Sequence, residues 1–104
     1  MAQGTFVQAL RKEAALSGTF MKGRSLMLNG AVLSIEDSGS RFSKNVNIEG
    51  SVRGSRGDLY KTHVALDMDE HEVIDYDCVC PAAYRYPGMC KHAIATALAY
   101  LDAS

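Results

Sequence analysis

The sequence predicts a small α+β domain, an antiparallel meander of three to four strands closed by a C-terminal helix. Two observations support this prediction. Residues 24–80 alternate between apolar and polar side chains, with turn-forming stretches between the alternating runs. Residues 91–102 instead place apolar side chains at helical spacing. A third observation concerns the junction, because all three cysteines lie within residues 78–90, between the last predicted strand and this helix.

The first twenty residues are expected to form a short helix or a linker, and residues 21–104 the folded domain. Thr5 and Gln8 have the spacing of a capping box at a helix start. Phe6 and Leu10 then fall on one apolar stripe. Gly18 is a reasonable place for this helix to stop.

The first strand is expected to begin at Arg24 and to reach Ile35, where the polar stretch 36–40 predicts a turn. Its apolar alternation changes phase near Gly30 and Ala31. A glycine at such a change of phase predicts a bulge or a bend.

Two further strands alternate cleanly. In the second, Val46, Ile48 and Val52 point to one face. In the third, residues 60–68 alternate in the same way, after a turn over 54–58. Another turn at 69–72 leads into a fourth strand over 73–80. The closing helix then carries its core stripe on three residues: Ile94, Leu98 and Leu101.

Three cysteines and a histidine surround the junction of the fourth strand and the closing helix, in the pattern C-x-C, nine residues, C-x-H. Side chains alternate on extended backbone, so Cys78 and Cys80 can point to the same side. Cys90 and His92 can converge with them if Cys90 immediately precedes the helix and His92 lies in its first turn. Three thiols and one imidazole complete a tetrahedral shell, and Cys₃His is a known structural zinc set. The sequence therefore predicts one bound Zn²⁺.

Other uses of these thiols fit the pattern less well. Buried free cysteines can act as small apolar residues, but here an odd number of them cluster beside a fourth donor. A catalytic zinc usually keeps an open position, which four protein ligands do not leave. Redox work of the thioredoxin kind needs C-x-x-C rather than C-x-C. Thiols that serve as ligands suit a reducing compartment, so we expect a cytoplasmic protein.

The metal motif resembles the SWIM zinc finger. The resemblance lies in Cys78-Val-Cys80-Pro81 and in Cys90-Lys91-His92 followed by an apolar helix. Upstream, residues 23–24, 30–32 and 52–55 with Tyr60 are similar to the strand-rich lead-in of members found in bacterial Swi/Snf-type helicases. The resemblance covers residues 22–101. It implies a binding domain for DNA or a protein partner, and an accessory role beside such a helicase.

Bulk composition limits the possible functions. The formal net charge is −1, from 11 Lys and Arg against 12 Asp and Glu, so there is no overall basic excess to favour nucleic acid. No apolar run approaches a membrane span, and the N-terminus has no signal-peptide core. We expect no membrane association, no small-molecule substrate and no catalytic residues, because no catalytic constellation is present. A Walker A motif is also missing from the sequence.

A local basic surface is still compatible with this composition. The candidate residues flank the turn after the second strand and the metal motif, with Tyr84 and Tyr86 interleaved for base stacking. Equally, such cations can be ordinary solvated side chains, which would leave a protein-interaction or structural module. The candidates for nucleic-acid or partner binding are Arg53, Arg56, Lys61, Arg85 and Lys91.

Two smaller features have simpler interpretations. His63 and His71 are expected to be surface histidines rather than additional ligands. The acidic residues of the 67–72 segment lack the spacing of an EF-hand, so a solvated turn is preferred to a calcium site.

Overall fold

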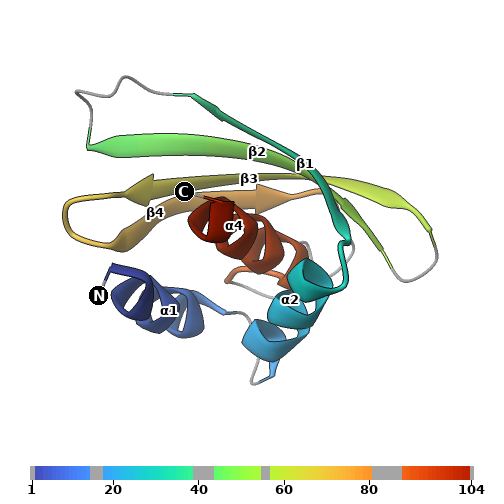
Figure 1. The fold of residues 1–104 in the computed structure, drawn as a ribbon, viewed down its shortest axis with the longest axis horizontal. Coiled ribbons are helices and arrows are strands. Elements are labelled where there is room, and N and C mark those ends of the chain that lie inside the picture. Colours follow the sequence, from blue (N-terminus) through green and yellow to red (C-terminus); the bar gives the residue numbers. More distant parts are fainter. Residues whose placement is uncertain (1, 15–17, 39–43, 55–56, 81–87, 104) are drawn as a thin grey trace.

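The computed structural model describes residues 2–14, 18–38, 44–54, 57–80 and 88–103 (Figure 1). Within these residues an N-terminal pair of helices precedes four strands and a final helix. The elements are α1 (Ala2–Glu13), α2 (Thr19–Leu28), β1 (Val32–Ser38), β2 (Asn45–Arg53), β3 (Leu59–Asp67), β4 (Glu72–Cys78) and α4 (Lys91–Ala103). The strands form one antiparallel sheet in the order β1-β2-β3-β4. The predicted α+β fold and the meander are confirmed.

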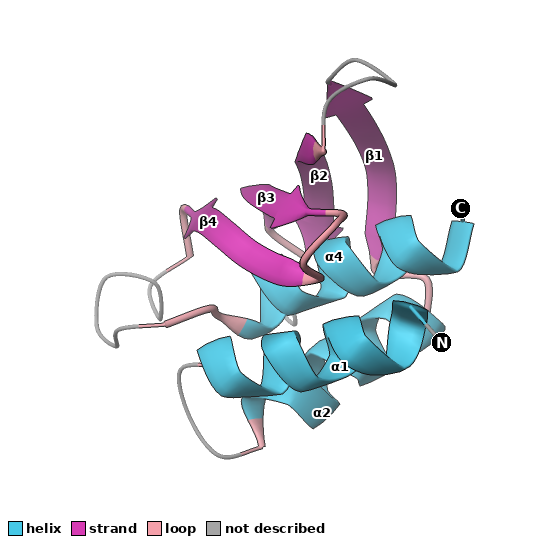
Figure 2. Ribbon diagram, turned by 90° about the vertical axis from the view of Figure 1, so that its left-hand side faces the viewer, coloured by secondary structure: helices cyan, strands magenta, loops and turns pink. Residues whose placement is uncertain are grey.

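The described helices all cover the same face of the sheet and leave the other face open (Figures 1 and 2). Helix α4 lies nearest the sheet and packs against β1, β2 and β3, while α2 packs on α4 and α1 reaches β4. Because α4 is covered on several sides, its residues from Ala93 to Leu98 are all buried. The alanines among them let the helix lie close to its neighbours.

The alternation of β2 and β3 sorts their side chains as predicted. Val46, Ile48 and Val52 are buried, and they pair in register with Leu66, Val64 and Tyr60 on the next strand. Gly50 occupies the remaining core position of β2, where a Cβ would come within 2.7 Å of Thr96 Cγ2. A glycine at this position therefore lets α4 approach the sheet.

The prediction of a strand from Arg24 is wrong, since residues 24–28 belong to helix α2. Leu26 and Leu28 alternate like a strand. The helical spacing of Phe20, Gly23 and Met27 nevertheless decides the structure, because these residues face the core.

The predicted bulge at Gly30 and Ala31 is also misplaced. Gly30 has φ of 77° and closes α2, with its N–H donating to Met27 O while Ala31 N–H donates to Leu26 O. This pair of bonds is a Schellman helix end, which favours glycine in the left-handed region. The irregularity of the sheet occurs slightly later, between Val32 and Ser34.

The N-terminal helix differs from its prediction at both ends. It begins at Ala2, so Thr5 lies inside the helix and the predicted capping box is wrong. It ends at Glu13, and Gly18, with φ of 89°, instead precedes α2. Phe6 and Leu10 are buried as their spacing indicates, in the same core as the sheet residues. The division into residues 1–20 and 21–104 stays a prediction.

The predicted boundaries of a turn and a strand also differ slightly from the observed ones. The predicted turn at 36–40 starts too early, because residues 36–38 continue β1 in register with β2; residues 39 and 40 lie outside the described part. The fourth strand ends at Cys78 rather than at Cys80. The hairpin between β2 and β3 is closed by Gly54 N–H, which donates to Asp58 O at 2.6 Å.

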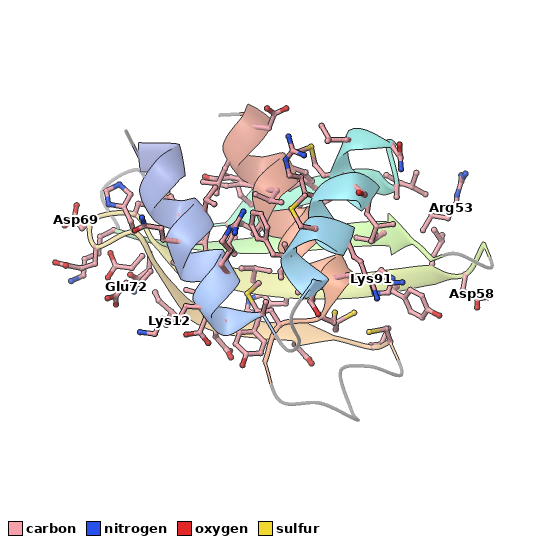
Figure 3. The ribbon with its side chains drawn as sticks, turned by 90° about the horizontal axis from the view of Figure 1, so that it is seen from below. Lys12, Arg53, Asp58, Asp69, Glu72 and Lys91 are labelled. Atoms are coloured by element: carbon pink, nitrogen blue, oxygen red, sulfur yellow. The ribbon has the colours of Figure 1, made fainter. Side chains whose placement is uncertain are left out.

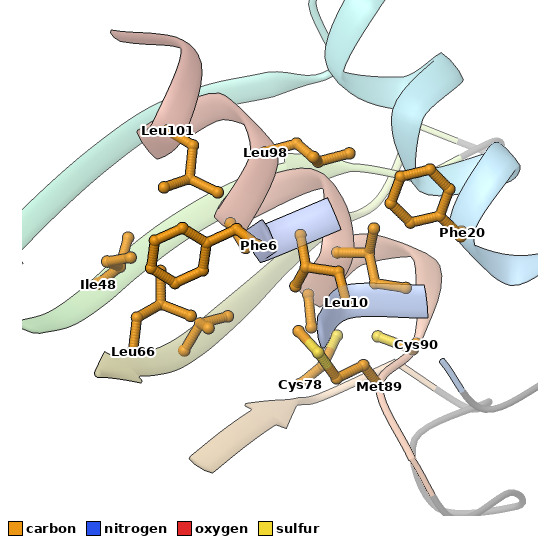
Figure 4. Packing of buried hydrophobic residues seen from close by; sticks show 14 of the residues in the cluster. Phe6, Leu10, Phe20, Ile48, Leu66, Cys78, Met89, Cys90, Leu98 and Leu101 are labelled. Atoms are coloured by element: carbon orange, nitrogen blue, oxygen red, sulfur yellow. The ribbon is translucent and has the colours of Figure 1, made fainter. Parts of the chain in front are cut away.

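The apolar core lies between the sheet and the helices (Figure 4). Phe6 and Leu10 of α1 meet Ile48 and Leu66 of the sheet and Leu98 of α4. Cys78, Met89 and Cys90 border the same cluster. The candidate site is therefore built onto the core rather than on a peripheral loop.

In the part of the chain that the structure describes, no helix is both long and apolar enough to cross a bilayer.

Candidate metal centre and basic surfaces

The four predicted ligands come from two elements that meet at one edge of the core. Cys78 is the last residue of β4, and Cys80 follows it by two positions. Cys90 immediately precedes α4, and its carbonyl accepts the N–H of Ile94 at 3.1 Å, as the residue before a helix should. His92 lies in the first turn of α4. Each element thus delivers its pair of ligands in the way the spacing predicts.

The donor atoms converge. One atom from each of Cys78, Cys80, Cys90 and His92 lies within 4.8 Å of all the others. The imidazole presents Nδ1 to the sulfurs, at 3.9 Å from Cys78 Sγ and 4.0 Å from Cys90 Sγ. A tetrahedron with bonds of ~2.3 Å has edges of ~3.8 Å, so a small contraction would seat Zn²⁺. The site fits the ion.

Burial also favours a metal over free thiols. The four residues are between 1% and 4% exposed. His92 Nε2 is a buried polar atom with no hydrogen-bond partner among the described residues. Burying such an atom costs stability unless another interaction of the ring offsets the cost. A metal bond at Nδ1 would supply that gain and would leave Nε2 to carry the proton.

The thiols differ in acidity in a way that suits metal binding. Hydrogen bonds from the Cys78 thiol, from His92 and from the N–H of Ala93 lower the pKa of Cys90, although burial opposes them. The shared hydrogen bond with Cys90, together with burial, raises the pKa of Cys78. A lowered pKa favours the thiolate, which is the form that binds zinc.

Two neighbouring contacts hold the ligands in place. The ring of Tyr60 lies 4.6 Å from the imidazole of His92, centroid to centroid. Gly54 makes room for this ring, since a Cβ there would lie 2.5 Å from Tyr60 Cε2. On the other side, Met89 N–H donates to Glu13 O at 2.7 Å. The end of α1 is therefore tied to the residue before Cys90.

The arrangement defines a class of site. Three thiols and an imidazole between a strand and a helix would complete a tetrahedral shell, and Cys₃His is a ligand set of structural zinc sites. Residues 60–101 match the family model of the SWIM zinc finger, and a SWIM zinc finger is therefore detected over this segment. The match spans β3, β4, the four donors and most of α4. No curated protein and no solved structure matches the chain.

The predicted basic residues do not gather on one face. Arg53 and Lys61 are exposed and lie on the open face of the sheet, since they alternate with the buried Val52 and Thr62. Lys91 is half-buried at the start of α4, on the helical side. Both groups nevertheless lie toward the metal end of the molecule, as the labelled Arg53 and Lys91 indicate (Figure 3). The remaining candidates and their aromatic neighbours lie outside the described residues: Arg56, Tyr84, Arg85 and Tyr86.

An acidic turn lies at the opposite end of the molecule. Asp69 and Glu72 lie far from Lys91 and Arg53 in Figure 3, at the turn between β3 and β4. Asp67 Oδ1 accepts the N–H groups of Asp69 and Glu70, each at 3.0 Å, and this geometry lowers the pKa of Asp67. These carboxylates do not form a metal-binding group among the described residues. The bonds to Asp67 instead suit the predicted turn.

Neither additional histidine is a plain surface residue. His63 Nε2 lies 3.1 Å from Asn47 Oδ1 on the open face. His71 has φ of 57°, and its ring makes an edge contact with Phe6 at 5.0 Å between centroids. Both are half-buried. These tertiary contacts have no signal in the local sequence.

The sequence patterns did not indicate Lys22 or the role of Gly23. Both precede the predicted meander, whereas in the structure they belong to α2, which packs on α4. The helical spacing of Phe20, Gly23 and Met27 is the signal that could have found them.

Proposed function

We propose that this zinc-binding module binds nucleic acid, DNA in particular, through the cationic residues at its metal end. The supporting observation is the separation of charge that the net value of −1 conceals. Acidic residues fill the β3–β4 turn at one end, and four cations lie toward the metal end: Lys22, Arg53, Lys61 and Lys91. Such a distribution steers a polyanion toward one end of the molecule.

The role of the metal in this function is structural. Zinc would hold the start of α4 against β4 and so fix the cations of the two faces relative to each other. The resemblance of residues 22–101 to members from bacterial Swi/Snf-type helicases supports an accessory position beside such a motor, in the cytoplasm. There the module would contribute affinity for DNA, and the motor would contribute ATP hydrolysis.

The test is a titration of the zinc-loaded chain with labelled duplex and single-stranded DNA at about 50 and 200 mM salt. Counterion release makes affinity for phosphates fall steeply over this range. Arg53→Gln and Lys61→Gln, each alone, should weaken binding. Lys44→Gln should not, because Lys44 lies beside the acidic turn, where its carbonyl accepts the N–H of Met68. Wild-type protein that shows no salt-sensitive binding would refute the proposal.

A second candidate function is protein interaction, and one observation favours it. Three carboxylates and a histidine lie opposite one another across all four strands of the open face: Glu36, Glu49, His63 and Asp77. These carboxylates would repel a phosphate backbone, so on this face nucleic acid would be restricted to the corner near Arg53, where Asp58 also lies (Figure 3). If DNA fails to bind, a basic protein segment on this face becomes the better hypothesis.

A further inference from the structure

A pocket between α2 and the start of α4 combines two cations with hydrogen-bonding side chains. It has a volume of about 290 Å³ and is lined by Met21, Lys22, Ser25, Leu26, Asn29 and Lys91. Nothing in the zinc chemistry requires these residues. The pocket is separate from the four ligands, although Lys91 lies between two of them in the sequence.

The close packing of α2 on α4 brings the two lysines to this pocket. Gly23 is buried against the first turns of α4, where a Cβ would lie 2.7 Å from Ile94 Cγ2 and 2.8 Å from Lys91 O. Any other residue at this position would push the helices apart. Lys22, the neighbour of Gly23, thereby lines the same pocket as Lys91.

Two like charges at one pocket repel each other, and an anion between them would remove that repulsion. The lining of the pocket contains no carboxylate among the residues that the structure describes. The acidic residues of the β3–β4 turn lie at the other end of the molecule (Figure 3). The pocket thus presents positive charge that its own lining does not neutralise.

The remaining lining residues suit a phosphate group. Ser25 and Asn29 are exposed and offer a hydroxyl and an amide as hydrogen-bond donors. Phosphate oxygens accept such bonds, and ammonium groups serve as point charges for phosphate. Met21 and Leu26 supply an apolar wall, on which a sugar could rest.

We propose that this pocket is a phosphate-binding site, with Lys22 and Lys91 as the charged ligands and Ser25 and Asn29 as hydrogen-bond donors. The inference rests on the proposed function for its biological source, the backbone of a bound nucleic acid. A free phosphate or nucleotide shares the same chemistry. Titrations with DNA and with inorganic phosphate separate the two sources.

The experiment uses the full zinc-loaded chain and the variants Lys22→Gln, Lys91→Gln and their combination. Arg24→Gln is the matched control, because Arg24 is an exposed cation on the same helix that does not line the pocket. Zinc content and melting temperature are measured for each variant. Lys22→Gln guards against a disturbed metal site, since Lys22 is exposed and, unlike Lys91, is not flanked by ligands.

In the first arm each protein is titrated with DNA. The double variant should lose affinity about tenfold, and the slope of its salt dependence should become shallower by about one unit for each phosphate that it no longer neutralises. Arg24→Gln should change the affinity and the slope by less than the double variant does. If the wild type binds DNA and the double variant binds no worse than Arg24→Gln, the DNA backbone is not the source of the phosphate, while the proposed function stands.

In the second arm, amide resonances are followed during titration with inorganic phosphate, against chloride at equal ionic strength. Saturable shifts at residues 22, 25, 29 and 91 that the double variant lacks are expected. If these shifts occur without any DNA binding, the site takes free phosphate, and only the proposed function fails. If neither DNA nor phosphate responds to the lysines, the phosphate site is refuted.

Discussion

The two halves of α4 are held to the sheet by different forces. Its first turn meets β4 through polar donors, Cys78 and Cys80 on one side and Cys90 and His92 on the other. Its second half meets the sheet and α1 through apolar side chains, among them Phe6, Leu98 and Leu101 (Figure 4). The apolar half is held to the sheet by the packing of its side chains alone. The metal end instead contains buried donor atoms that need an ion to compensate for their burial.

This difference has a physical origin in the size of the domain. A chain of 104 residues has a limited core, and four of the buried residues at the metal end are ligand donors rather than large apolar side chains. A metal clip stabilises such a region without further apolar burial. Removing the ion should therefore loosen one end before the other, and four predictions test this view.

The largest effect is expected from loss of the metal. Apparent binding energies of structural zinc are about 10–16 kcal/mol, comparable with the whole stability of a domain. Chelation or Cys90→Ser should release zinc, lower the melting temperature sharply and broaden the amide signals of residues 88–94 first. Val79→Ser is the control, since Val79 lies between two ligands but is 53% exposed. If the metal-free protein melted at the same temperature, zinc would not be what holds the first turn of α4 to β4.

Next comes a cavity in the apolar half. Phe6 is buried, so Phe6→Ala should reduce the free energy of unfolding by about 3–5 kcal/mol. Zinc stoichiometry of the folded variant should stay at one per chain. Gln8→Ala, an exposed change on the same helix, is the control for helix propensity. Denaturant unfolding gives the energy; a variant that lost zinc while folded would show that the halves are not separable.

A loss of stability of intermediate size should follow from crowding the contact between α4 and the sheet at Gly50. In Gly50→Ala, the new methyl would lie 2.7 Å from Thr96 Cγ2 and 3.0 Å from Thr62 Oγ1, which already contacts Thr96 Oγ1 at 2.6 Å. Overpacking of this kind costs about 1–3 kcal/mol. Thr96→Ala should recover part of the loss in a double-mutant cycle. Purely additive effects would mean that Gly50 does not set the distance of α4 from the sheet.

The smallest effect is expected at the acidic turn. The N–H groups of Glu70 and Asp69 bond to Asp67 and lower the pKa of its carboxyl below the unfolded value. The resulting stabilisation is present above the unfolded pKa, near ~4, and is lost as the pH falls through the folded pKa. Asp67→Asn should therefore flatten the decline of stability between about pH 4 and 2. An identical pH profile in both proteins would refute the role of Asp67.

Spacing within the sequence determined the ligand set, the alternating strands and the closing helix. Cys78 to Cys80 and Cys90 to His92 are local patterns, and so is the alternation along β2. The backbone period alone fixes which way these side chains point. These features can therefore be predicted without the fold.

Only the tertiary structure decided the rest. Residues 24–28 became helix because Phe20, Gly23 and Met27 face the core together, and a short apolar run does not reveal its period by itself. Likewise, the separation of Lys91 from Arg53 and its approach to Lys22 depend on which helices pack on which face of the sheet. Contacts between residues distant in sequence carry no local signal, and the sheet and α2 bring those residues together.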